Sequence, residues 1–392
     1  VGFEPLGEEL SDVVIELIES EKDVEKLEGY VTALHHLLKV VKWDETITEP
    51  RRIWIKFWRS LNRMIEEDMN REVTSLFVQE VANCIETMSK EATQLFADSV
   101  LYEIGIMVKN LFEKEMRRID NNEPERIPSL LNIAVTIFRH LLPMKKPIAH
   151  ILNHLMPIVF PLIDKCNNKF WGVRFMNILL INVPEFVLQF RNQVYPLLFH
   201  TLNDQRSKMR RQTADAFGHM AESNIDEWKE MAVSSIDLLC AMIEREDARL
   251  EGNISATEEA LGAVIKIMKY CDEKMVGIGR MNEILSRFLS WFPFAGESSE
   301  CTNIYGFLID LIESHHFSLN IEPNSNTPRL LYILTKAIHD ELFDDEYEMK
   351  ERVKATIMEM ASVSDSFEET VRLSGLNEDE KASLRRILAP TN

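Results

Sequence analysis

Between residues 202 and 221 the chain reads LNDQRSKMRRQTADAFGHMA, and its apolar and small side chains recur with a helical period. The residues that share this period are Met209, Thr213, Ala216, Phe217 and Met220. They step along the chain at intervals of three or four, which places them on one face of a helix. A preceding helix is expected to end at Leu202, and Asp204 suits the turn and can cap the second helix.

An apolar residue followed by glycine recurs inside the predicted helices. The pairs are Trp171-Gly172, Phe217-Gly218, Leu261-Gly262 and Tyr305-Gly306. The last three pairs are 44 residues apart, and the first lies 46 residues before the second. A glycine within a helix costs about 1 kcal/mol relative to alanine, so its recurrence indicates places where a neighbouring helix comes close. Paired helices with this period are typical of HEAT repeats, and we therefore predict an all-α superhelix of such repeats, an α-α solenoid.

The same patterning covers the whole chain. Helices are expected over residues 5–20, 23–42, 71–89, 95–118, 168–182, 185–202, 225–245, 255–270, 280–292, 298–314, 327–342 and 345–361. Further helices are expected to begin at Pro50 and at Pro147, to cover the apolar stripe 130–142, and to end near Leu388. Loops are expected at residues 120–128 and 316–326. No linker rich in glycine or serine interrupts the series, so residues 1–392 are interpreted as one continuous array of about nine helix pairs.

Three of these helices begin with recognisable sequence signals. They are a capping box from Ser255 to Glu258, a cap at Thr327 followed by Pro328, and Asn377 with Glu380 before the last helix.

The composition agrees with a helical protein. Glycine (13) and proline (14) are both scarce, and 45% of the 392 residues are hydrophobic. No apolar run is long enough to span a membrane. The sequence starts Val1-Gly2-Phe3, without methionine or a signal-peptide pattern, and we expect a fragment of a longer chain.

The cysteines indicate the cellular compartment of the protein, and the net charge indicates the kind of partner that it binds. Five cysteines without a C-x-x-C pair indicate buried apolar residues in the cytosol or nucleus: Cys84, Cys166, Cys240, Cys271 and Cys301. The net charge of −20 favours basic partners and disfavours nucleic acid and anionic lipid. Acidity that merely keeps the chain soluble is the open alternative. The helix that begins at Pro50 carries several arginines, which either bind an acidic partner or form a solvent-exposed face.

Possible metal sites are incomplete. His150 and His154 share a helical face, but no glutamate lies between them as in H-E-x-x-H and no third ligand follows. No phosphate-binding loop or G-x-S-x-G elbow is present.

Two acidic segments imitate the magnesium boxes of terpenoid synthases. Asp344-Asp345-x-x-Glu348 resembles the first box, and Asn203-Asp204-x-x-Ser207 resembles most of the second. Arg211 stands where the second box needs its closing acid, and the two boxes come in reverse order. We therefore predict no enzyme, no catalytic residue, no cofactor and no metal.

A solenoid lines up its second helices along an inner wall. Acidic residues expected there, off the apolar stripes, are Asp215, Glu222, Glu258, Glu259, Asp310 and Glu313. Such a wall can accept segments rich in lysine or arginine, so these six residues are the candidate partner-binding set. The alternative is that they only face solvent.

Several segments resemble the karyopherin-β family of nuclear transport receptors, and within it the importin beta-3 branch. They are FWGVRF (170–175), MRRQTADAFGHMAE (209–222), NISATEEALGAVIKIMKY (253–270), LSRFLSWFPF (285–294), LIDLIESHH (308–316) and NSNTPRLLYIL (324–334). The resemblance runs from about residue 70 to the end. One departure is Glu259, where the family has asparagine in its ATEN motif.

The resemblance implies the carboxy-terminal arch of a monomeric import receptor in the cytoplasm, the nucleus and the nuclear pore. Its partners would be basic cargo proteins, phenylalanine-glycine nucleoporins and the GTPase Ran, which releases cargo and binds mainly to repeats that precede this arch. The alternative function is a HEAT scaffold that holds together a multiprotein enzyme complex.

Overall fold

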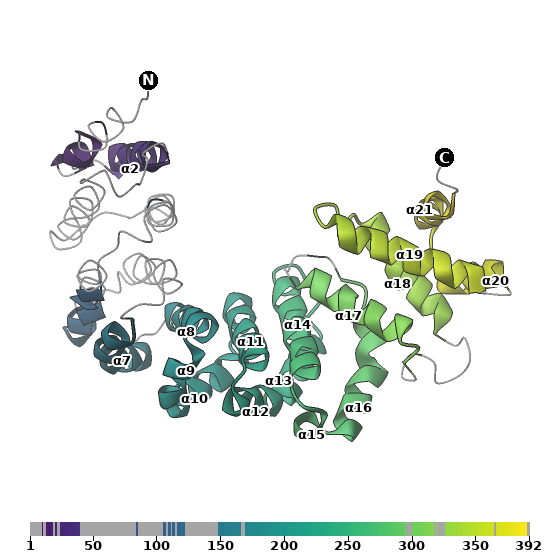
Figure 1. Cartoon of the computed structure of the whole chain (residues 1–392), viewed down its shortest axis with the longest axis horizontal. Helices are drawn as coiled ribbons and strands as arrows, with labels where there is room; N and C mark the ends of the chain where they lie inside the picture. Colours follow the sequence, from purple (N-terminus) through teal and green to yellow (C-terminus); the bar gives the residue numbers. More distant parts are fainter. Residues whose placement is uncertain are drawn as a thin grey trace, which may run out of the picture. The chain divides into compact units, whose positions relative to one another are not determined.

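The computed structural model describes residues 148–165, 169–294, 296, 300–316, 319, 326–363 and 366–389, and before them Cys84 and parts of 10–39 and 105–121 (Figure 1). The chain divides into two compact units, Val1–Val187 and Leu188–Asn392. In this described part the regular structure is entirely helical, without a strand. No helix in it is both long and apolar enough to cross a membrane.

The first unit contains α2 (Val24–Leu38), α7 (Ile148–Lys165), α8 (Phe170–Asn182) and α9 (Pro184–Val187). Phe112 packs against α8, with its ring 5.7 Å from Trp171 and 5.8 Å from Phe175. Gly172 lies so close to α7 that an added Cβ would be 2.6 Å from Ile163.

The helices of the second unit follow the predicted order. They are η2 (Leu188–Phe190), α10 (Arg191–Thr201), α11 (Ser207–Glu222), α12 (Asp226–Ser234), α13 (Ile236–Ile243), α14 (Ile254–Tyr270), α15 (Glu273–Val276), α16 (Ile278–Phe288), η3 (Leu289–Trp291), α17 (Cys301–Glu313), α18 (Thr327–His339), α19 (Tyr347–Val363), α20 (Phe367–Ser374) and α21 (Glu378–Leu388).

Second helices of successive pairs pack directly on one another in this unit. α11 contacts α14, α14 contacts α17, and α17 contacts α19 (Figure 1). The predicted apolar face of α11 is buried from Met209 to Met220. α14 lies within the row and is buried on every side, from Ala256 to Met268. The prediction of an all-α HEAT-repeat fold is therefore confirmed.

The recurring glycines mark the closest approaches. A Cβ added to Gly218 would lie 3.1 Å from Lys266 Cδ of α14, and one added to Gly262 would lie 2.5 Å from Glu300 Cγ. At Gly306 the neighbour is the methyl end of Met349, at 3.3 Å. The interpretation of the mid-helix glycines is confirmed.

Some predicted helices are interrupted. The segment 225–245 is two helices, α12 and α13, because Ser235 donates its hydroxyl to Ala232 O at 2.7 Å and competes with the helical hydrogen bonds. The short helices α15 and α20 were not predicted. α20 ends at Gly375, whose φ of 78° lies in the left-handed region that favours glycine.

Helix capping was predicted with mixed success. The box of Asn377 and Glu380 is confirmed by reciprocal hydrogen bonds of 2.9 Å. The box at Ser255 is wrong, because α14 begins at Ile254 and the Ser255 hydroxyl, inside the helix, is buried without a partner. Asp204 does not cap α11 and instead accepts from the backbone N–H of Arg206 at 2.9 Å within the turn.

The cap of α18 was misplaced by one residue, since Asn326 holds the cap position and Thr327 is already helical. The helices expected from Pro50, over 71–89 and over 130–142 lie outside the described residues, apart from Cys84, as do most of the loops 120–128 and 316–326. The continuous array of nine pairs stays a prediction.

Four of the cysteines are free and buried, namely Cys84, Cys240, Cys271 and Cys301, and Cys166 lies outside the described residues. Burial raises the pKa of the last three of these four thiols, to about 11 for Cys240 and Cys271 and about 12 for Cys301. They act as small apolar residues of the core.

Gly262→Ala is expected to lower the stability of the protein by about 1–3 kcal/mol, because the new methyl group collides with Glu300 near its backbone. Gly306→Ala is the matched control: the Met349 side chain can move aside, and alanine gains up to about 1 kcal/mol of helix propensity. Thermal unfolding of the two variants measures the difference. Equal midpoints would contradict the close approach at Gly262.

Candidate functional site

The six candidate acidic residues lie on three successive second helices. Asp215 and Glu222 are on α11, Glu258 and Glu259 are on α14, and the last two are on α17. Because α14 packs between α11 and α17, the first four residues share one region of the unit.

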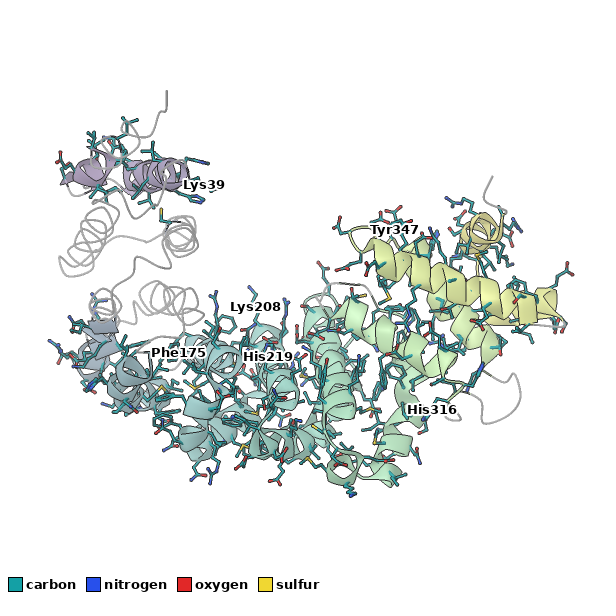
Figure 2. All side chains as sticks on the ribbon, in the orientation of Figure 1. Lys39, Phe175, Lys208, His219, His316 and Tyr347 are labelled. Carbon is teal, nitrogen blue, oxygen red and sulfur yellow. The ribbon has the colours of Figure 1, made fainter. Side chains whose placement is uncertain are left out.

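A chain of charged groups joins α11 to α14 around His219, which Figure 2 labels on α11. The His219 ring lies 2.9 Å from Asp215 Oδ1 and 3.3 Å from Glu222 Oε2. Glu222 Oε1 is in turn 3.5 Å from Lys266 Nζ of α14. Lys266 Nζ donates to Glu300 Oε1 at 2.7 Å, just before α17 begins. Lys266 of α14 thus connects α11 with the residue that precedes α17.

The network changes the protonation of its members. Burial alone would lower the pKa of His219, but hydrogen bonds to Asp215 and Glu222 raise it to about 9, so the ring is charged at neutral pH. Burial likewise opposes the charge of Lys266, yet its pKa is raised by Glu300 and the other carboxylates nearby.

Glu259 is buried beside this network. Its carboxylate accepts from Arg211 Nε at 3.2 Å, and only 4% of the residue is exposed. Burial, with the charges of Asp215 and Glu300, raises the pKa of Glu259 to about 7, although Arg211 opposes the shift. The prediction that this side chain stands on an open wall is therefore wrong.

Glu258 was also expected at the surface and is fully buried. Its carboxylate accepts from the backbone N–H of Gly296 at 2.9 Å. Gly296 belongs to the connection between α16 and α17, which crosses over α14. The helical period could not reveal this burial, because the cover is a loop that follows more than 30 residues later.

The described residues 292–294 of the α16–α17 connection make several contacts. Phe292 packs 5.1 Å from Phe288 and 5.3 Å from Tyr305, measured between ring centroids. Arg249 lies 5.0 Å over the Phe294 ring, and Arg329 donates to Phe292 O at 2.6 Å. These contacts hold residues 292–294 against α16, α17 and α18.

Asp310 and Glu313 are exposed, as predicted, and share one partner. Arg352 of α19 donates to Asp310 Oδ1 at 2.7 Å and to Glu313 at 3.1 and 2.6 Å. Both carboxylates raise the pKa of Arg352. An exposed pair of this kind contributes only about 0–1 kcal/mol to stability.

The sequence prediction missed the basic partners and the carboxylate of Glu300. The repeat period could have revealed two of these neighbours. Lys266 follows Glu222 by 44 residues and pairs with it, and Glu259 follows Asp215 by the same interval. Opposite charges at equivalent positions attract, and like charges raise a carboxyl pKa. The 34-residue step from Lys266 to Glu300 has no such signal.

The described residues contain no cluster of histidine, cysteine and acidic side chains suited to a metal ion. Asp344 of the first magnesium-like box is 2.6 Å from Lys350 Nζ. Asp204 of the second is held by Arg206, whose hydrogen bond is the main cause of its lowered pKa. Both carboxylates are neutralised by cations of their own chain.

No family model matches the chain. Solved structures do: Kap121p bound to Pho4p has a TM-score of 0.71 at 14% identity and covers 98% of this chain and 35% of that one. Kap121p bound to Nup53p has a TM-score of 0.68 at 14% identity, covering 97% and 35%. Kap121p bound to RanGTP has a TM-score of 0.62 at 15% identity, again covering 97% and 35%.

The chain has the HEAT-repeat fold of a karyopherin. It spans about a third of the length of the Kap121p chains that it matches. At this sequence identity the likeness establishes the fold.

Glu259→Gln is expected to stabilise the protein at pH 8 by about 1–3 kcal/mol and to have little effect at pH 5. Folding raises the pKa of Glu259 from 4.5 to about 7, so its stabilising contribution is complete below pH 4.5 and is lost as the pH rises through 7. Glutamine keeps an acceptor for Arg211 and carries no charge. Urea unfolding at the two pH values measures the change.

Glu222→Gln is the matched control for that experiment. Burial alone would raise the pKa of Glu222, but His219 and Lys266 lower it. Losing the negative charge of Glu222 should therefore destabilise the protein at pH 8. Stabilisation by both substitutions, or by neither, would show that the negative charge of Glu259 does not destabilise the folded protein.

Proposed function

We propose that this chain is part of a karyopherin-β nuclear transport receptor, and that it acts by binding proteins and not by catalysis. The single observation that carries the proposal is the HEAT-repeat fold, which matches Kap121p over nearly the whole chain. Kap121p has been crystallised with Pho4p, with Nup53p and with RanGTP, which supports a role in protein binding.

Basic cargo segments are the proposed partners of the second-helix surface. Asp215 and Glu222 are its accessible acids in the α11–α14 region, with side chains 25% and 34% exposed. Each is already paired with a cation of the chain, so a lysine or arginine of a cargo exchanges one ion pair for another. Single contacts then contribute about 1 kcal/mol or less, and useful affinity requires several contacts along the array.

The finer parts of the proposal rest on the sequence resemblance. They are the importin beta-3 branch, phenylalanine-glycine nucleoporins as partners, release of cargo by Ran-GTP in the complete receptor, a monomeric state, and movement between cytoplasm and nucleus through the pore. The strong negative charge supports basic partners in particular.

A HEAT scaffold for a multiprotein enzyme complex is the alternative function. The two functions differ in how binding responds to nucleotide. Pull-down of a basic cargo by the full-length receptor should be lost when Ran loaded with GTP is added and kept when Ran carries GDP. Failure of the full-length protein to bind Ran, cargo or nucleoporins would favour the scaffold.

The acidic surface itself is tested with the double variant Asp215→Asn and Glu222→Gln. Affinity for a fluorescent lysine-rich localisation peptide should fall about three- to tenfold, because two contacts of up to about 1 kcal/mol each are lost. Binding should also weaken between about 50 and 300 mM salt, since exposed charges are screened. Fluorescence polarisation measures both effects.

The matched control is Glu227→Gln and Glu230→Gln on α12, which removes the same charge from exposed positions of a first helix. These substitutions should leave peptide affinity nearly unchanged. Equal losses in the two double variants would mean that only the net charge of the chain attracts the peptide.

A further inference from the structure

A cluster of charged side chains between α11, α14 and the residue before α17 contains more acids than bases. Its members within the described part of the chain are the acids Asp215, Glu222, Glu259 and Glu300 and the bases Arg211, His219 and Lys266. If all these described members are ionised, four negative charges face three positive ones. Glu259, Lys266 and Glu300 are at most 7% exposed, and an unbalanced charge is costly there, so neutrality requires one further proton.

The geometry of the cluster identifies the member that holds this proton. His219 presents both ring nitrogens to carboxylates, Nε2 to Asp215 at 2.9 Å and Nδ1 to Glu222 at 3.3 Å (Figure 2). A neutral imidazole has a single N–H donor, so both contacts are favourable only when the ring is charged. Glu259 is buried, and the carboxylates of Asp215 and Glu300 act on it, which raises its pKa to about 7. The further proton therefore belongs to Glu259.

Asp215 links this buried proton to the surface of α11. The side chain of Asp215 is 25% exposed, whereas that of Glu259 is 6% exposed. Burial is the main cause of the raised pKa of Glu259, and the negative charge of Asp215 comes next. A cation that binds Asp215 from outside offsets this repulsion, so Glu259 then holds its proton less tightly. An external charge can thus act on the buried carboxyl without contacting it.

We propose that Glu259 holds one proton at neutral pH and releases it when a partner protein places a lysine on Asp215. The O–H bond of the Glu259 carboxyl breaks, its electron pair stays on the carboxylate, and the proton passes to water. One positive charge leaves the cluster as another arrives, so its net charge is unchanged. This coupling rests on the proposed cargo surface of α11. Binding there is stronger at pH 8, where Glu259 is already ionised and attracts the lysine, than at pH 6, where it is neutral.

Proton release is measured with the full chain and an acetylated lysine-rich localisation peptide that contains no histidine, so that the peptide itself does not titrate. Isothermal titration calorimetry at pH 7 in PIPES and in imidazole, buffers with different enthalpies of ionisation, gives the number of protons released per peptide. Because the pKa of Glu259 is about 7, the carboxyl is half protonated at this pH, and about 0.3–0.5 proton is expected. Binding without release, or with proton uptake, would overturn the proposal.

The source of the proton is tested with Glu259→Gln, which keeps an acceptor for Arg211 and cannot ionise. In the unaltered chain, peptide affinity should rise about three- to fivefold from pH 6 to pH 8, the effect of one additional exposed contact. In Glu259→Gln the rise should be less than about twofold, and proton release should be lost. Undiminished release from this variant would identify another source, such as His219, and would overturn the proposal.

Glu227→Gln is the matched control, because it removes a carboxylate from an exposed position of α12. It should keep both the proton release and the rise of affinity with pH, since the histidines of the chain titrate equally in the two variants. Equal loss in Glu227→Gln and Glu259→Gln would overturn the proposal.

The coupling and the cargo surface fail in different ways. Binding of equal affinity at pH 6 and pH 8, without proton release, would overturn the coupling and leave the cargo surface of α11 intact. Absence of peptide binding at every pH would overturn both.

Discussion

In the second unit, α11, α14, α17 and α19 pack on one another in series, and most other features follow from that packing. α14 is the clearest example, because it lies between α11 and α17 and is buried from Ala256 to Met268. Helices that pack this closely need glycine at the points of contact, as at Gly218 and Gly262. The glycines recur at a regular interval in the sequence because each repeat places one of them at the equivalent helix contact.

The same packing brings charges together that are far apart in the sequence. Equivalent positions of adjacent repeats become neighbours, so Glu222 meets Lys266 and Asp215 comes near Glu259. One pairing is favourable and the other raises a carboxyl pKa towards neutrality. A surface predicted to be simply acidic is in fact a network in which acids and bases of the chain largely neutralise one another, and only partly exposed members such as Glu222 are accessible to a partner.

The sequence was sufficient to predict the class of fold, the buried face of α11 and the glycines of the helix contacts, because these depend on a period that repeats along the chain. It was insufficient for Glu258 and Glu259. Glu258 is covered at Gly296, which lies in the connection between α16 and α17, and no helical period describes that connection. Glu259 is buried against α11, where it pairs with Arg211. The capping signal at Ser255 was wrong because Asn253 holds the cap position of α14, two residues earlier.

Lys266 joins α11, α14 and the residue that precedes α17 through Glu222 and Glu300. An array of stacked helices bends by small changes at each junction, and a shared buried cation makes two neighbouring junctions resist bending together. We therefore expect the second unit to bend more readily at its other junctions. The exposed arginine bridge from α17 to α19 is the softer of the two kinds of connection, because water can replace its partners at little cost.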